Sequence, residues 1–187
     1  TELDSDKLAL DPYLVTVKIL GVVMINSGRH TAHIEGDFVV FLIGARLNRL
    51  RAANQMRRIG AAMTAMQRTL AQHPELGCLH TQNWFGRTTI AVQYWRDFPS
   101  LERFARDRDL PHLQSWRDFN RLARESHDIG IWHETFQVAA APYETMYVNM
   151  PGFGLAAAGR LDPVSGASTA ARRLGRTRAT PAPVPVT

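Results

Sequence analysis

The stretch Phe38-Val-Val-Phe-Leu-Ile-Gly44 decides the fold. Its apolar residues are continuous rather than alternating, and its β-branched content favours a strand that is buried on both faces. The segment 53–72 follows, with apolar residues three and four positions apart, which is the period of a helix that buries one stripe; they are Met56, Ile59, Met63, Met66 and Leu70. His73-Pro74 and Gly77 end this helix. The pattern therefore predicts a core strand followed by a packed helix.

The rest of the chain continues this alternation. Residues 76–84 and 88–95 predict two antiparallel strands joined around Phe85-Gly86-Arg87. Four more elements are expected: a short helix from residue 98, a second helix from 109 to 125, a strand at 129–138 and a fifth strand at 143–148. This order predicts an α+β fold, a ferredoxin-like antiparallel sheet with helices on one face. Because its second face is apolar and uncovered, two such sheets are expected to pack together as a homodimeric α/β barrel.

The two ends differ from this central region in composition. We expect residues 1–30 to form an N-terminal arm with a strand-like stretch at 15–25, and residues 31–158 to form the ferredoxin-like domain. Residues 159–187 consist mainly of Ala, Pro, Ser, Gly, Thr and Arg. Since this segment has few large apolar side chains to offset the entropy of ordering, we predict a disordered tail.

The charge distribution argues against a nucleic-acid partner. The chain has 187 residues and a net charge of +5, and four of those charges belong to the tail, which has five arginines and one aspartate. The body is therefore nearly neutral, without the basic surface interleaved with aromatics that nucleic acid requires. The longest apolar run, residues 38–45, is far short of the roughly 20 residues that span a bilayer. Cys78 is the only cysteine, which excludes an intrachain disulfide and favours a reducing, cytoplasmic location.

Two histidines stand out by their context. His112 shares a helical stripe with Trp116 and Phe119, so it is expected to point into the apolar interior. His133 alternates with Ile131 on one face of the predicted strand, while Glu134 lies on the other face. An imidazole is costly in an apolar interior unless its nitrogens are satisfied. A pocket for a small molecule between helix and sheet is the functional interpretation, and a hydrogen-bonded core histidine is the structural one.

A metal cofactor places different demands on these residues. A nonhaem metal needs a third ligand, and no His-x-x-x-His or Cys-x-x-Cys spacing supplies one. A haem iron needs a single protein ligand on one side and a polar group on the other, in a dry apolar slot. One helix histidine and one strand histidine among Met, Trp and Phe residues match that demand.

Four segments together resemble the C-terminal half of the haem-dependent aldoxime dehydratases. They begin at Trp95-Arg-Asp-Phe-Pro, His112-Leu-Gln-Ser-Trp116, Ile131-Trp-His-Glu134 and Tyr143-Glu-Thr-Met. The longer span from Arg29 to Ala157 is similar to small proteins described as monooxygenase-like or phenylacetaldoxime dehydratase-like. Both groups are relatives of the dimeric α/β barrels.

The resemblance implies specific roles. His112 would be the axial ligand of haem b, with Trp116 and Phe119 beside the cofactor, and His133 would be the distal acid and base. The implied activity is that of a lyase on a small organic substrate with an N–O bond. The dehydratases contain two fused barrel halves, and their distal Arg and Ser have only compositional counterparts in Ser27, Arg29 and Thr31.

Two other functions are consistent with the same sequence. One is a cofactor-independent monooxygenase of the dimeric-barrel type, which would consume O₂ with a phenol or quinol. The other is a noncatalytic dimeric ligand-binding protein, in which replacing His133 would leave ligand affinity intact.

Overall fold

The computed structural model describes residues 24–107, 121, 124, 127–164 and 169–174. The predicted strand-like stretch at 15–25 and the predicted helix at 109–125 fall almost wholly outside these ranges. Within them, no helix is long and apolar enough to cross a membrane.

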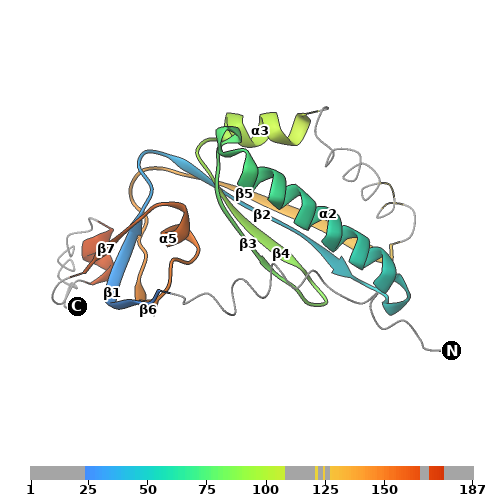
Figure 1. The fold of residues 1–187 in the computed structure, drawn as a ribbon, viewed down its shortest axis with the longest axis horizontal. Helices are drawn as coiled ribbons and strands as arrows, with labels where there is room; N and C mark the ends of the chain where they lie inside the picture. Colours follow the sequence, from blue (N-terminus) through green and yellow to red (C-terminus); the bar gives the residue numbers. More distant parts are fainter. Residues whose placement is uncertain (1–23, 108–120, 122–123, 125–126, 165–168, 175–187) are drawn as a thin grey trace, which may run out of the picture.

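A four-stranded antiparallel sheet forms the centre of the molecule (Figure 1). Its strands are β2 (Phe38–Leu47), β3 (Cys78–Trp84), β4 (Ile90–Trp95) and β5 (Ile129–Val138), in the spatial order β3-β4-β2-β5. This order places the first strand of the predicted unit between the third and the fourth, which is the ferredoxin-like arrangement. The predicted fold class is confirmed, including the continuous apolar strand at its middle.

Two helices pack against one face of this sheet. Helix α2 (Ala53–Gln72) follows a 3-10 turn, η2 (Leu50–Ala52), and α3 (Phe98–Arg106) follows β4. The main core cluster between helices and sheet consists of Val39, Leu70, Trp95, Leu101 and Phe104. A second 3-10 turn, η3 (Pro74–Leu76), ends at Gly77, whose φ of 90° lies in the left-handed region that favours glycine. The helix stop predicted at this point is thus confirmed.

A second, three-stranded sheet lies beside the first (Figure 1). Strand β1 (Asn26–His33) is its centre, with β6 (Tyr147–Met150) and β7 (Arg160–Pro163) on either side. The short helices α5 (Leu155–Ala158) and α6 (Ala170–Arg173) follow β6 and β7 respectively. Ala32 and Ile34 join Phe38, Leu155 and Ala156 in one buried cluster, so this sheet packs onto the end of the larger one.

This second sheet corrects several predictions. The segment 159–187 was expected to be a disordered tail, but β7 lies in it and pairs with β1 through Ala32 and Leu161. The physical reason is that Leu161 packs against the buried cluster while the backbone of β7 satisfies an otherwise open edge of β1. The expected boundary between residues 30 and 31 falls inside β1. The fifth strand begins at Tyr147 rather than at residue 143.

The sequence suggested that the face of the large sheet opposite α2 and α3 is uncovered. The structure shows that part of this face is covered. Phe153 lies edge-on to Trp84, with ring centroids 6.1 Å apart. The backbone N–H of Gly154 donates to Oε1 of Gln82 at 3.4 Å. The segment between β6 and α5 therefore covers the β3 side of this face and leaves the β5 side more open.

Candidate functional site

Strand β5 places His133 on the helix-facing side of the sheet. In the register of β2 with β5, Ile43 lies opposite His133 and Phe41 lies opposite Thr135. Glu134 pairs with Leu42 and therefore points to the other face, as the alternation predicted.

A cavity of about 270 Å³ lies between this face and the two helices. Its lining is predominantly apolar, with side chains from β2, β4, β5, α2 and α3: Phe41, Ile43, Ala62, Met63, Met66, Gln93, Phe98, Leu101, Glu102, Phe104, Ala105, His133 and Thr135. A volume near the lower end of the range for ligand pockets suits a small organic molecule.

His133 is the titratable ring of this cavity. Its side chain is solvent-exposed, and its ring lies 5.8 Å from that of Phe41 at an angle of 43°. Within the described part of the chain it makes no hydrogen bond and no ion pair. The imidazole is therefore available to accept or donate a proton to a molecule in the cavity.

The other polar groups of the lining limit the charge of a ligand. Glu102 is the only carboxylate among the lining residues that the structure describes, and it forms an ion pair with Arg106 at 2.8 Å. Within the described ranges, no lysine or arginine lines the cavity. A ligand of this cavity is therefore expected to be neutral when it binds.

Sequence reasoning missed Gln93, which is buried in the cavity wall with only 1% of its surface exposed. Its Oε1 accepts a hydrogen bond from Nε1 of Trp95 at 2.9 Å. Its Nε2 is buried and has no partner. The available signal was the alternation of Ala91, Gln93 and Trp95, which places an amide on the buried face of a strand.

The structure leaves part of the predicted site untested. His112, Trp116 and Phe119 lie outside the described residues, so the expected pairing of His112 with His133 stays a prediction. Ser27, Arg29 and Thr31 lie on β1 in the second sheet, and none of them lines the cavity. Among the described residues, no group of three or more His, Cys, Asp or Glu side chains could hold a metal ion.

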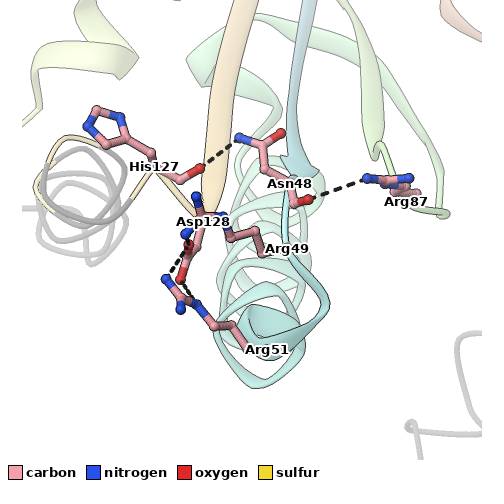
Figure 2. Close-up of polar contacts among 6 residues, drawn as sticks. All are labelled: Asn48, Arg49, Arg51, Arg87, His127 and Asp128. Carbon is pink, nitrogen blue, oxygen red and sulfur yellow. Dashed lines mark hydrogen bonds and ion pairs between the residues drawn. The ribbon is translucent and has the colours of Figure 1, made fainter.

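A polar cluster fixes the start of β5, four residues before His133 (Figure 2). Asp128 accepts hydrogen bonds from Nε and Nη2 of Arg51 at 2.8 and 3.0 Å. The backbone carbonyl of Asp128 accepts from the N–H of Asn48, also at 2.8 Å, and the Asn48 side chain donates to the carbonyl of His127. Hydrogen bonding to Arg51 lowers the pKa of Asp128. The cluster joins the end of β2 to the start of β5, the two strands whose register places His133 in the cavity.

Cys78 is the only cysteine of the sequence, and its place in a strand-like run favours a small packing residue over a nucleophile. Burial raises the pKa of its thiol to about 12, because a thiolate would lose its hydration there. Its Sγ lies 3.7 Å from the carbonyl oxygen of His80. The group is therefore held as a neutral thiol, which supports its interpretation as a small packing residue.

The fold and the cavity define a class of protein: a ferredoxin-like α+β protein with an apolar cavity between sheet and helices. A family model described as "Monooxygenase af470-like" matches residues 38–155, which include the whole four-stranded sheet. The chain belongs to this family.

A curated relative agrees with this assignment. The chain is 35% identical over 124 residues to the protein named "Monooxygenase af470" of Aspergillus fumigatus. The alignment covers 62% of this chain and 44% of the relative, so the chain spans less than half the length of that protein.

Two solved aldoxime dehydratases share the fold. One, in complex with butyraldoxime, is 18% identical to this chain, with a TM-score of 0.57. The match covers 67% of this chain and 38% of the dehydratase chain. The other is 19% identical with a TM-score of 0.57, over 70% and 41% respectively. The resemblance to the monooxygenase-like proteins is thus confirmed at the level of the family, and the resemblance to the aldoxime dehydratases at the level of the fold.

Proposed function

We propose that the chain is a monooxygenase that acts on a small, neutral and largely apolar organic molecule in the His133 cavity. The observation that carries this proposal is an imidazole that has no partner among the described residues, in the wall of an apolar cavity whose described lining has no cationic side chain. The activity named for the Aspergillus fumigatus relative supports the reaction type.

In this reaction His133 removes a proton from an activated C–H or a phenolic O–H of the substrate. The resulting anion transfers its electrons to O₂. For a substrate with an activated CH₂ group, the sum is CH₂ + O₂ → C=O + H₂O, so the substrate supplies all four electrons and no external reductant is needed. The apolar lining, which includes Met63, Met66 and Phe104, suits both O₂ and an aromatic ring.

Oxygen uptake with dithranol, an anthrone with such a CH₂ group, tests this proposal. We expect one O₂ consumed per dithranol oxidised, above the rate without protein, and a loss of this excess in His133→Gln. His73→Gln is the matched control, because His73 is an exposed histidine outside the cavity. Equal uptake by both variants would show that His133 has no role in the reaction.

A haem-dependent lyase of the aldoxime dehydratase type is the second candidate. It is favoured by the resemblance of residues 95–155, in which His112 would be the axial ligand of haem b and Trp116 and Phe119 would contact it. The described residues fit the substrate side of such a site, since a free imidazole and an apolar lining are present. The proposed iron ligand, His112, lies outside the described residues.

When bound, haem would supply an iron that holds the substrate nitrogen. His133 would donate a proton to the oxygen of the oxime hydroxyl as water leaves, and would then accept the proton from the adjacent carbon.

The visible spectrum separates the two candidates. Protein produced with a haem precursor would show a Soret band that disappears in His112→Ala, and it would convert butyraldoxime to butyronitrile. Colourless protein that consumes O₂ with dithranol would exclude the lyase. A homodimer and a cytoplasmic location remain part of the proposal under either reaction.

A further inference from the structure

In the side-chain amide of Gln93, the oxygen has a hydrogen-bond partner and the nitrogen has none among the described residues. The indole N–H of Trp95 only donates, so the oxygen of the Gln93 amide must be the atom that faces it. This contact fixes the orientation of the amide and makes Nε2 the remaining group. Nε2 is buried without a hydrogen-bond partner.

A buried amide N–H without an acceptor is unfavourable and uncommon in folded proteins. The oxygen of this amide has a structural partner in the buried indole N–H of Trp95, whereas the N–H groups of Nε2 have none. The unsatisfied donor borders the cavity, where a bound molecule is positioned to supply the acceptor.

We propose that Nε2 of Gln93 donates a hydrogen bond to an oxygen of the substrate, and that the substrate is a conjugated ketone or phenol. This inference rests on the proposed function for the role of His133 at the other end of the substrate. It adds the group that recognises the substrate oxygen and a limit on the substrate's length.

The strand register gives the distance between the two groups. Gln93 lies opposite Phe41 in β2, whereas His133 lies opposite Ile43 on the other side of β2. Two strand spacings and two residues along the strand separate their Cα atoms by about 12 Å. Phe41 lies between them and contacts the ring of His133. A molecule that reaches both Gln93 and His133 must therefore extend across the ring of Phe41.

This separation matches substrates whose acidic hydrogen and oxygen lie on opposite sides of an aromatic ring. Anthrones, in which the CH₂ group and the carbonyl oxygen lie across one ring, have this arrangement. When His133 removes the proton, conjugation carries negative charge to the distant oxygen. A hydrogen bond from Gln93 then becomes stronger, because its acceptor is charged. Because the described lining contains no lysine or arginine, the neutral N–H donor of Gln93 is the described group that would stabilise this charge.

An alternative is that a single buried water satisfies Gln93. Thr81 lies opposite Gln93 in β3, and its Oγ1 is also buried without a partner. One water could bond to both groups and leave the cavity without a recognition element.

A matched ligand pair tests the proposal without O₂ or haem. Acetophenone and α-methylstyrene have the same shape, but only the ketone has an acceptor oxygen. Tryptophan fluorescence of the full chain would report binding of each. We expect the wild type to bind acetophenone about tenfold more tightly. In Gln93→Met this ratio should fall to one with the affinity for α-methylstyrene unchanged, whereas the exposed control Gln137→Met should keep the ratio.

Other outcomes would overturn the proposal. One is an equal affinity of the wild type for both ligands, and another is an unchanged ratio in Gln93→Met. A third is an equal loss of affinity for both ligands in Gln93→Met, which would indicate that Gln93 only packs or binds a structural water. If Gln93→Met does not fold, NMR of the wild type decides: acetophenone, but not α-methylstyrene, should shift the Gln93 side-chain amide signals. A ratio that depends on Gln93 in a protein without O₂ uptake would overturn the proposed function but not this binding site.

Discussion

Arg51 and Asp128 form a two-pronged hydrogen bond, at 2.8 and 3.0 Å, between the turn after β2 and the residue that precedes β5. Asp128 is 7% exposed, and it also lies 3.6 Å from Nη1 of Arg49. The backbone of the same residue bonds to Asn48. The pair therefore holds together the ends of the two strands that present Ile43 and His133 to the cavity.

We expect Asp128→Asn to lower the melting temperature by several degrees at pH 7, because Arg51 loses its charged partner. The pKa of Asp128 is lowered in the folded chain. Its stabilising effect is therefore present above roughly pH 4 and is lost as the pH falls through the lowered pKa. Thermal melts of both proteins from pH 3 to pH 8 should converge at the acid end. Asp162→Asn, in the more exposed pair with Arg160, is the control and should change little.

Helix α3 forms one wall of the cavity and depends on its first turn. The side chain of Asp97 accepts a hydrogen bond from the backbone N–H of Ser100 at 2.6 Å. We expect Asp97→Ala to cost about 1 kcal/mol of unfolding free energy in urea melts. Asp97→Asn should retain most of the stability, since asparagine is an equally good cap. Equal losses in both variants would indicate that the charge, rather than the cap, stabilises the helix.

The sequence was most informative where one periodicity dominates. The apolar run of β2 and the three-four spacing of α2 each bury a continuous surface, so their local pattern determines their structure. Strand β7 has only four residues, and it forms because β1 offers an edge that lies more than 120 residues away in the sequence. The local sequence of β7 contains no pattern from which its pairing with this edge could be predicted.

In the candidate site, too, local patterns predicted some features, whereas others depend on tertiary contacts. His133 was predicted on the correct face because strand alternation is a local rule. The role of Gln93 could not be predicted, since it depends on an indole two residues along the strand and on a cavity made by two helices. The predicted partner of His133, His112, lies outside the described residues and remains a prediction.

The raised pKa of Cys78, about 12, predicts an unreactive thiol. At pH 8 roughly one molecule in 10⁴ would carry the thiolate, so a disulfide reagent should react about a thousandfold more slowly than with a free cysteine. Urea should restore the ordinary rate. Rapid labelling of the folded chain would show that this strand opens readily.

The predicted homodimer has a testable contact. Phe136 lies on the sheet face opposite the helices and is 49% exposed. We expect light scattering to give twice the chain mass of 21.0 kDa for the wild type, and a monomer for Phe136→Arg. Phe85→Arg, in an exposed turn where the phenylalanine is 68% exposed, should remain a dimer. A monomeric wild type would contradict the dimeric barrel.

The central claim is that the imidazole of His133 transfers the substrate proton in this cavity, and chemical rescue tests it most directly. The rate of dithranol-dependent O₂ uptake should fall about 100-fold or more in His133→Ala. Because the His133 side chain is exposed at the cavity, added imidazole should enter the vacated space and restore a substantial part of the rate in a saturable manner. Uptake by His133→Ala at the wild-type rate, with no response to imidazole, would contradict the account.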